Sequence, residues 1–166
     1  MDKGHNAASR WPLPLFAALC VMEASVLNHN SKFQIINFIE QHKLNGVMNN
    51  TKWNKLFHDL NEVDELISFK VTYIDGTTWP EPEATFPFTS ELAQIWGNFL
   101  ALEFIDINAK ISHSRGALLN DEVVDHIGKI IQICIDNSAK FSITEEGVRI
   151  YGYLRHSDSV QLYNYT

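Results

Sequence analysis

The feature that most constrains the fold is a short run of alternating residues in the first half of the chain. Between Leu66 and Ile74, apolar residues alternate with polar ones (Ile67, Phe69, Val71 and Tyr73 against Ser68, Lys70 and Thr72). A period of two is typical of a strand with one buried and one solvated face. Asp75-Gly76 then gives a turn signal, so we expect residues 77–79 to pair back briefly. The run therefore predicts an antiparallel hairpin.

Two helices are predicted before this strand. We expect the first from Lys32 to His42, capped by Ser31 and ended by Asn45-Gly46, with one apolar face of Phe33, Ile36 and Ile39. The second is expected from Thr51 to Val63, capped by Asn50 or Thr51, with an apolar stripe of Trp53, Leu56, Phe57 and Leu60. These helices are expected to pack as a pair.

The second half of the sequence predicts further strands and helices. After the loop at residues 80–83, Thr89 is expected to cap a short helix through Trp96. Residues 99–107 predict a central buried strand, residues 108–116 a loop, and residues 121–135 a helix with acids in its first turn. Residues 140–144 and 148–155 flank Glu145-Glu146-Gly147 as a hairpin.

This order of elements predicts an α+β fold, because strict alternation of strands and helices is absent. We expect an N-terminal helical pair packed on a largely antiparallel sheet of four or five strands, with one further long helix. Three regions are expected: an apolar N-terminal extension at 1–30, a single domain at 31–156 and a C-terminal tail at 157–166.

The N-terminal extension leaves three interpretations open. Its apolar run, residues 11–27, follows Arg10 as a signal-peptide core would follow a basic residue. However, Pro12 and Pro14 interrupt the run and Glu23 lies inside it, which disfavours both export and a membrane span of about 20 apolar residues. The other two interpretations are a docked helix and an extension upstream of a start at Met22 or Met48.

The charge of the chain limits its partners. Thirteen Lys and Arg residues against twenty Asp and Glu residues give a net charge of -7. Nucleic acid and anionic membranes are therefore not expected as partners. A basic protein is the expected partner. Cys20 and Cys134 lie far apart in apolar runs, which indicates buried reduced thiols and favours the cytoplasm. The oligomeric state stays open.

No metal or cofactor site is predicted. His58 with Glu62, and Glu122 with His126, have the spacing of neighbours on a helical face. A metal site needs a third ligand at a suitable spacing, and none is present, so solvated helical faces explain both pairs. Glycines do not cluster, which excludes a phosphate-binding loop.

No catalytic residue is predicted either. Glu103 and Asp106 flank the apolar strand but should lie on its opposite faces. His113 and Arg115 share a loop that could bind an anion, although such a loop is more often simply hydrated. We therefore expect a protein that is not an enzyme. The alternative is a small-molecule-binding or enzymatic domain whose site is assembled from these four scattered residues.

One segment is suited to binding a protein. Asp75 precedes it, and its aromatic and acidic residues stand around three prolines: Trp79, Glu81, Glu83, Phe86 and Phe88. Aromatic anchors supply much of the energy of protein interfaces, and acidic groups steer a basic partner. The competing interpretation is that the aromatics fold back to cover a sheet edge.

Three short motifs resemble one family of small bacterial proteins known as a domain of unknown function. They are Met48-Asn49-Asn50-Thr51-Lys52-Trp53, Leu102-Glu103-Phe104-Ile105-Asp106-Ile107 and Val148-Arg149-Ile150-Tyr151-Gly152-Tyr153. The resemblance covers about residues 31–156 and implies no catalytic residue. By class alone, a small acidic chain of this kind is also similar to immunity proteins that neutralise toxins. The leading hypothesis is therefore an immunity protein that occludes a toxin through an acidic, aromatic-bearing surface.

Overall fold

The computed structural model describes residues 32–63, 67–82, 88–90, 99–113, 115, 121–156 and 159–164. The predicted extension at 1–30 lies outside these residues. The elements are α2 (Lys32–Gln41), β1 (Asn45–Gly46), α3 (Asn50–Asn61), β2 (Ser68–Tyr73), β3 (Thr78–Trp79), a 3-10 turn (Phe99–Ala101), β4 (Leu102–Asn108), β5 (Lys110–His113), β6 (Glu122–Asp125), α4 (Ile127–Asp136), β7 (Lys140–Ile143), β8 (Gly147–Tyr151) and β9 (Tyr153–Leu154). No helix in this described part of the chain is long and apolar enough to cross a membrane.

The centre of the fold is a five-stranded antiparallel sheet in the order β3-β2-β4-β8-β7. The predicted hairpin of β2 and β3 is present, with Val71 opposite Trp79. β4 is the central strand, as its apolar sequence predicts, and its Ile105 and Ile107 are buried. Two short ribbons, β1-β9 and β5-β6, complete the described strands. These features confirm an α+β fold built on an antiparallel sheet.

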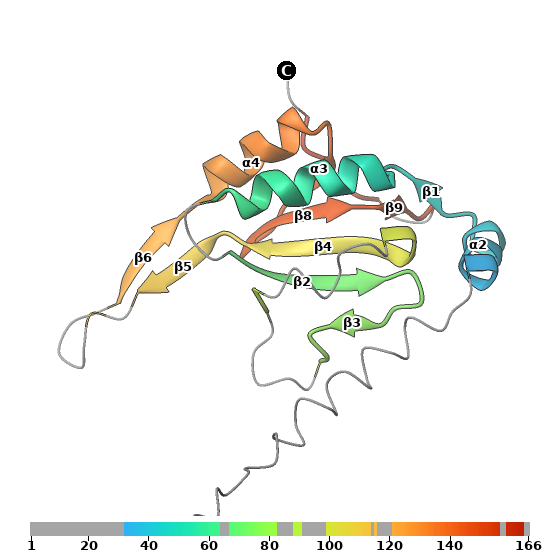
Figure 1. The fold of residues 1–166 in the computed structure, drawn as a ribbon, viewed down its shortest axis with the longest axis horizontal. Coiled ribbons are helices and arrows are strands. Elements are labelled where there is room, and N and C mark those ends of the chain that lie inside the picture. Colours follow the sequence, from blue (N-terminus) through green and yellow to red (C-terminus); the bar gives the residue numbers. More distant parts are fainter. Residues whose placement is uncertain are drawn as a thin grey trace, which may run out of the picture.

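Helices α3 and α4 cover one face of this sheet (Figure 1). Between them and the strands, the rings of Trp53, Phe57 and Phe99 stack with centroids 5.4–6.2 Å apart. The two helices are also joined by polar contacts, because Asn137 on the turn after α4 donates to Asp59 on α3 at 2.7 Å. This hydrogen bond is the main cause that lowers the pKa of Asp59.

Helix α2 differs from its prediction. The expected pairing of α2 with α3 is not confirmed, and α2 instead packs into a separate cluster centred on Ile35, Leu44 and Ile74. Its predicted apolar face is wrong in part. Ile39 packs against this cluster, but Phe33 is 70% exposed and Ile36 is also exposed, and Ile35 is the buried residue of the helix. The helix ends before residues 45–46, and these form β1 and pair with β9 instead of acting as its terminus.

The predicted loop at 108–116 and the first part of the predicted helix at 121–135 are wrong. Residues 110–113 and 122–125 form the ribbon β5-β6, which extends away from the sheet (Figure 1), and α4 starts at Ile127. Basic residues face acidic ones across the ribbon, with Lys110 opposite Asp125 and His113 opposite Glu122. Such cross-strand pairs favour a strand pair that lies outside the core.

The cap of α3 differs from prediction. The side chain of Asn49, rather than Asn50 or Thr51, caps α3 by accepting from the backbone N–H of Lys52 at 2.9 Å. The backbone of Thr89, the predicted cap of a further short helix, pairs with Phe69 of β2 through two hydrogen bonds of 2.8 and 2.9 Å. Residues 91–96 of that predicted helix lie outside the described residues.

The C-terminal hairpin of β7 and β8 agrees with the sequence. Gly152, directly after β8, allows a close backbone contact, because a Cβ atom there would lie 2.2 Å from the carbonyl oxygen of Leu102. In the predicted tail, the N–H of Tyr163 donates to the carbonyl of Phe141 at 2.8 Å, and the two rings stack. The described part of the tail therefore runs beside β7.

Candidate functional site

The predicted partner-binding residues begin at the β2–β3 turn. Asp75 is exposed, and its carboxylate accepts from the N–H and the hydroxyl of Thr77 at 3.0 and 2.6 Å. These bonds stabilise the turn, in which Gly76 has a φ of 86° that favours glycine. Asp75 thus shapes the start of the segment.

Trp79 lies on the edge strand β3 and packs against the hydrophobic core. It is half-buried, and its indole Nε1 has no hydrogen-bond partner in the described structure. Its ring therefore covers the sheet edge, which is the position that the competing interpretation expects for it. Glu81 beyond it is exposed, while Glu83 and Phe86 lie outside the described residues.

Phe88 lies in a different environment from Trp79. It is half-buried and lines a hollow of about 170 Å³ at the β7–β8 turn. We call this hollow the acidic hollow; its lining residues are Phe88, Asp106, Ile107, Thr144, Glu145, Glu146 and Arg149. It brings one aromatic residue of the predicted binding segment beside carboxylates from two other parts of the chain.

The acidic hollow is built on the face of the sheet opposite α3 and α4. Alternation along the strands places Lys70, Asp106, Arg149 and Ser142 on this face, directly opposite one another on four neighbouring strands. Asp106 and Arg149 form a two-pronged ion pair in this row, with Nε–Oδ1 and Nη2–Oδ2 distances of 2.6 and 2.9 Å. The hydrogen bonding that Arg149 donates to Asp106 is the main cause that raises the pKa of Arg149.

Aromatic rings hold Arg149 in place. Its guanidinium carbon lies 4.0 Å from the centroid of the Phe104 ring, which is a cation–π contact. Phe104 in turn packs against Tyr151, whose hydroxyl is 2.9 Å from the hydroxyl of Ser142. The planar guanidinium is thereby restrained on two sides, so the floor of the acidic hollow is ordered before any partner binds.

The charge of the acidic hollow is negative. Three carboxylates, at Asp106, Glu145 and Glu146, stand against the single guanidinium of Arg149, which leaves a formal charge of -2. Asp106 neutralises Arg149, whereas Glu145 and Glu146 are exposed and make no ion pair with a described residue. The hollow can therefore attract a cationic group next to an aromatic surface.

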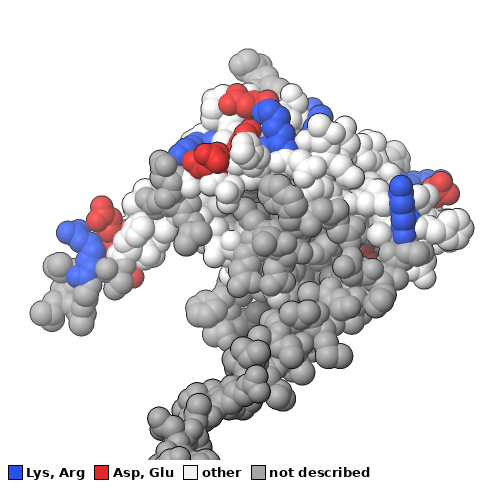
Figure 2. All heavy atoms as spheres, in the orientation of Figure 1, with Lys and Arg blue, Asp and Glu red and all other residues white. Residues whose placement is uncertain are grey.

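The four residues of the alternative site lie apart. Glu103 is buried and bound by Arg155, and Asp106 faces the acidic hollow. His113 and Arg115 are exposed at the far end of the β5-β6 ribbon, where residues of both charges gather (Figure 2). The described residues include no group of three or more potential metal ligands, so His58 with Glu62 and Glu122 with His126 gain no third ligand.

Sequence reasoning missed the part of the acidic hollow that the β7–β8 turn supplies. The sequence predicts a turn at Glu145 and Glu146 and a strand at Arg149, but it gives none of the three a role in binding. The available signal was the acidic pair itself, which precedes Gly147 in a hairpin turn and must therefore be solvated. Its proximity to Phe88 depends on the tertiary structure.

The comparison with protein families gives one match, and the comparisons with curated proteins and with solved structures give none. The match is to the model of a family of unknown function, and it spans residues 35–157. This agrees with the resemblance to a domain of unknown function. The chain therefore belongs to this family, DUF6678.

Proposed function

We propose that this protein is a protein-binding module for a basic partner, and most concretely an immunity protein that neutralises a bacterial toxin by occluding it. The observation that carries the proposal is the acidic hollow, in which half-buried Phe88 stands beside the unpaired carboxylates of Glu145 and Glu146. A basic toxin surface would present the complementary charge. The proposal involves neither nucleic acid nor membrane.

Two physical properties support the proposal: a partly exposed aromatic ring and a negative electrostatic potential. A partly exposed aromatic ring offers a large contact area at low entropic cost, and such rings are enriched among the residues that dominate binding energy. The net charge of -7 and the local charge of -2 attract a cationic partner over several ångströms and raise its association rate.

The rigid floor of the hollow supports the same proposal. The Asp106–Arg149 pair and the Phe104 ring are held by mutual contacts, so little ordering is required when a partner binds. Arg149 also screens Asp106, which leaves the cation-binding role to Glu145 and Glu146. We further propose the cytoplasm as the compartment, because Cys134 is a buried free thiol.

The test is to mix the purified protein with the product of the neighbouring gene and to measure binding at two salt concentrations. The variant Glu145→Lys/Glu146→Lys is expected to weaken the complex at least tenfold, mostly through slower association. The matched control is Glu40→Lys/Glu62→Lys, which makes the same change of net charge at one exposed position in α2 and one directly after α3. Absence of a complex, or equal weakening by both variants, would count against the proposal.

A further inference from the structure

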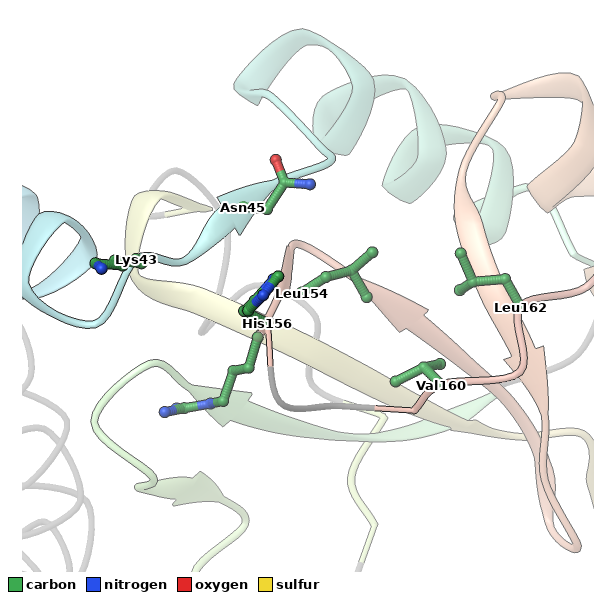
Figure 3. A pocket seen from close by; sticks show the side chains of 7 residues that line it. Lys43, Asn45, Leu154, His156, Val160 and Leu162 are labelled. Carbon is green, nitrogen blue, oxygen red and sulfur yellow. The ribbon is translucent and has the colours of Figure 1, made fainter.

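A second hollow lies between β1, β9 and the C-terminal segment. It has a volume of about 240 Å³ and is lined by Lys43, Asn45, Leu154, Arg155, His156, Val160 and Leu162 (Figure 3). We call it the C-terminal groove. In Figure 3, Lys43 stands at one end, Val160 and Leu162 at the other, and Leu154 and His156 between them. It shares no lining residue with the acidic hollow.

The polar end of the C-terminal groove is basic, although the chain as a whole is acidic. Lys43, Arg155 and His156 line it, and none of its seven lining residues is acidic. Arg155 is already bound, because it donates to both carboxylate oxygens of Glu103 at 2.5 and 2.6 Å and to the carbonyl of Ile74 at 3.0 Å. Arg155 is therefore held in place at the side of the groove, and Glu103 neutralises its charge.

The other polar side chains of this groove can donate hydrogen bonds to a ligand. Lys43, Asn45 and His156 are exposed, and their side chains make no hydrogen bond or ion pair within the described structure. The backbone of Lys43 is nevertheless held in place: its N–H donates to the carbonyl of Glu40, and its φ of 50° turns the chain out of α2 into β1. The Lys43 side chain therefore starts from a backbone position that is held in place.

The opposite end of the groove is apolar. Val160 and Leu162 are half-buried there, and half-buried Leu154 on β9 extends the apolar surface to the middle of the groove. The C-terminal segment that carries the last two is attached to the sheet by the hydrogen bond and ring stacking between Tyr163 and Phe141. The groove therefore joins a cationic end to an apolar end.

We propose that the C-terminal groove binds a small amphiphilic carboxylate. The carboxylate would accept charge-assisted hydrogen bonds from Lys43 and His156, and its alkyl chain would cover Leu154, Val160 and Leu162. An inorganic anion would leave the apolar end unfilled, and a neutral lipid would leave the ammonium unpaired. Ligand pockets for drug-sized molecules have about 300–1,000 Å³. A groove of about 240 Å³ therefore suits a short chain.

The experiment titrates the full-length, isotope-labelled protein with sodium octanoate and follows the backbone amide resonances. Octanoate is expected to shift the amides of residues 43–46, 154–156 and 159–164 in a saturable way. Acetate supplies the charge without the chain and 1-octanol the chain without the charge, so each is expected to bind at least tenfold more weakly. Saturable shifts confined to other residues, or no shifts in a folded protein, would overturn the proposal.

Single substitutions test the polar end and the apolar end of the groove one at a time. Lys43→Gln and Leu162→Ser are each expected to weaken octanoate binding about tenfold, and His156→Gln tests the second donor. The matched control is Lys110→Gln, which removes an exposed lysine from the β5-β6 ribbon. Equal affinity for Lys43→Gln and Lys110→Gln would refute the assigned role of the ammonium. Either result leaves the acidic hollow untouched, so the two proposals fail independently.

Discussion

Replacing Arg155 with methionine is the sharpest test of how this fold is held together. The carboxylate of Glu103 is on the central strand, 6% exposed, and both of its oxygens accept from Arg155 at 2.5 and 2.6 Å. Arg155 also donates to the carbonyl of Ile74 at the end of β2. Methionine keeps much of the apolar stem of the side chain but leaves a buried charge without its partner.

The structure sets the size of the effect. Removing one partner of a buried ion pair costs about 3–5 kcal/mol, because the remaining charge stays desolvated. The Arg155 side chain is 32% exposed, so water can approach Glu103 in the variant and the loss should lie near the lower limit. We therefore expect a loss of about 3 kcal/mol in the free energy of unfolding, which corresponds to a fall of roughly 6–12 °C in Tm for a chain of this size.

Urea unfolding at neutral pH, followed by tryptophan fluorescence, measures this loss. The control is Arg115→Met, which breaks a pair with Glu122 at 4.0 Å whose side chains are 56% and 61% exposed. An exposed pair contributes less than about 1 kcal/mol. Adding Glu103→Gln to the Arg155 variant removes the unpaired charge, so it is expected to recover part of the lost stability.

One result would refute this reasoning: an Arg155→Met variant no less stable than Arg115→Met. The double variant Arg155→Met/Glu103→Gln gives a second readout. If it is no more stable than Arg155→Met alone, the loss comes from packing instead of a desolvated carboxylate.

Two further predictions concern the backbone and the buried thiol. Gly152→Ala is expected to lower the free energy of unfolding by several kcal/mol, because the new Cβ would lie 2.2 Å from a β4 carbonyl oxygen. Gly128→Ala in α4 meets no atom within 4 Å and is expected to stabilise by up to about 1 kcal/mol, so equal urea midpoints for the two variants would contradict the packing argument. Burial raises the pKa of the Cys134 thiol to about 12, so at pH 8 it stays protonated. In a variant without the other cysteine, a thiol reagent should therefore react in urea and not with the native protein.

The parts of the fold that could be predicted are those whose signal is local. The alternation of β2 and the Asp75-Gly76 turn specify a hairpin within a few residues, and the structure contains it. The C-terminal hairpin has the same kind of signal, an acidic turn between two apolar runs. Neither prediction requires knowledge of which distant segment covers the strands.

The β5-β6 ribbon could not be predicted in the same way. It projects from the sheet, and three of the four residues of β5 are exposed, so burial imposes little alternation on its sequence. Its strands are matched by cross-strand charge, such as Lys110 opposite Asp125, which becomes visible when the register is known. In β6, Val123 also lies at helical spacing from Ile127 and Ile130 of α4, so the helix predicted from the sequence starts too early.

The acidic hollow also depends on the register of the strands. Asp106 on β4 and Arg149 on β8 could each be assigned to a polar face from the sequence, but their pairing follows from the alignment of the two strands. A slip of one residue would turn Asp106 towards the core and separate it from Arg149. The second pair obeys the antiparallel order, since Glu103, earlier on β4, meets the later Arg155. Both ion pairs therefore favour the same register of the central strand, and the charges that shape the candidate site also help to specify the fold that presents it.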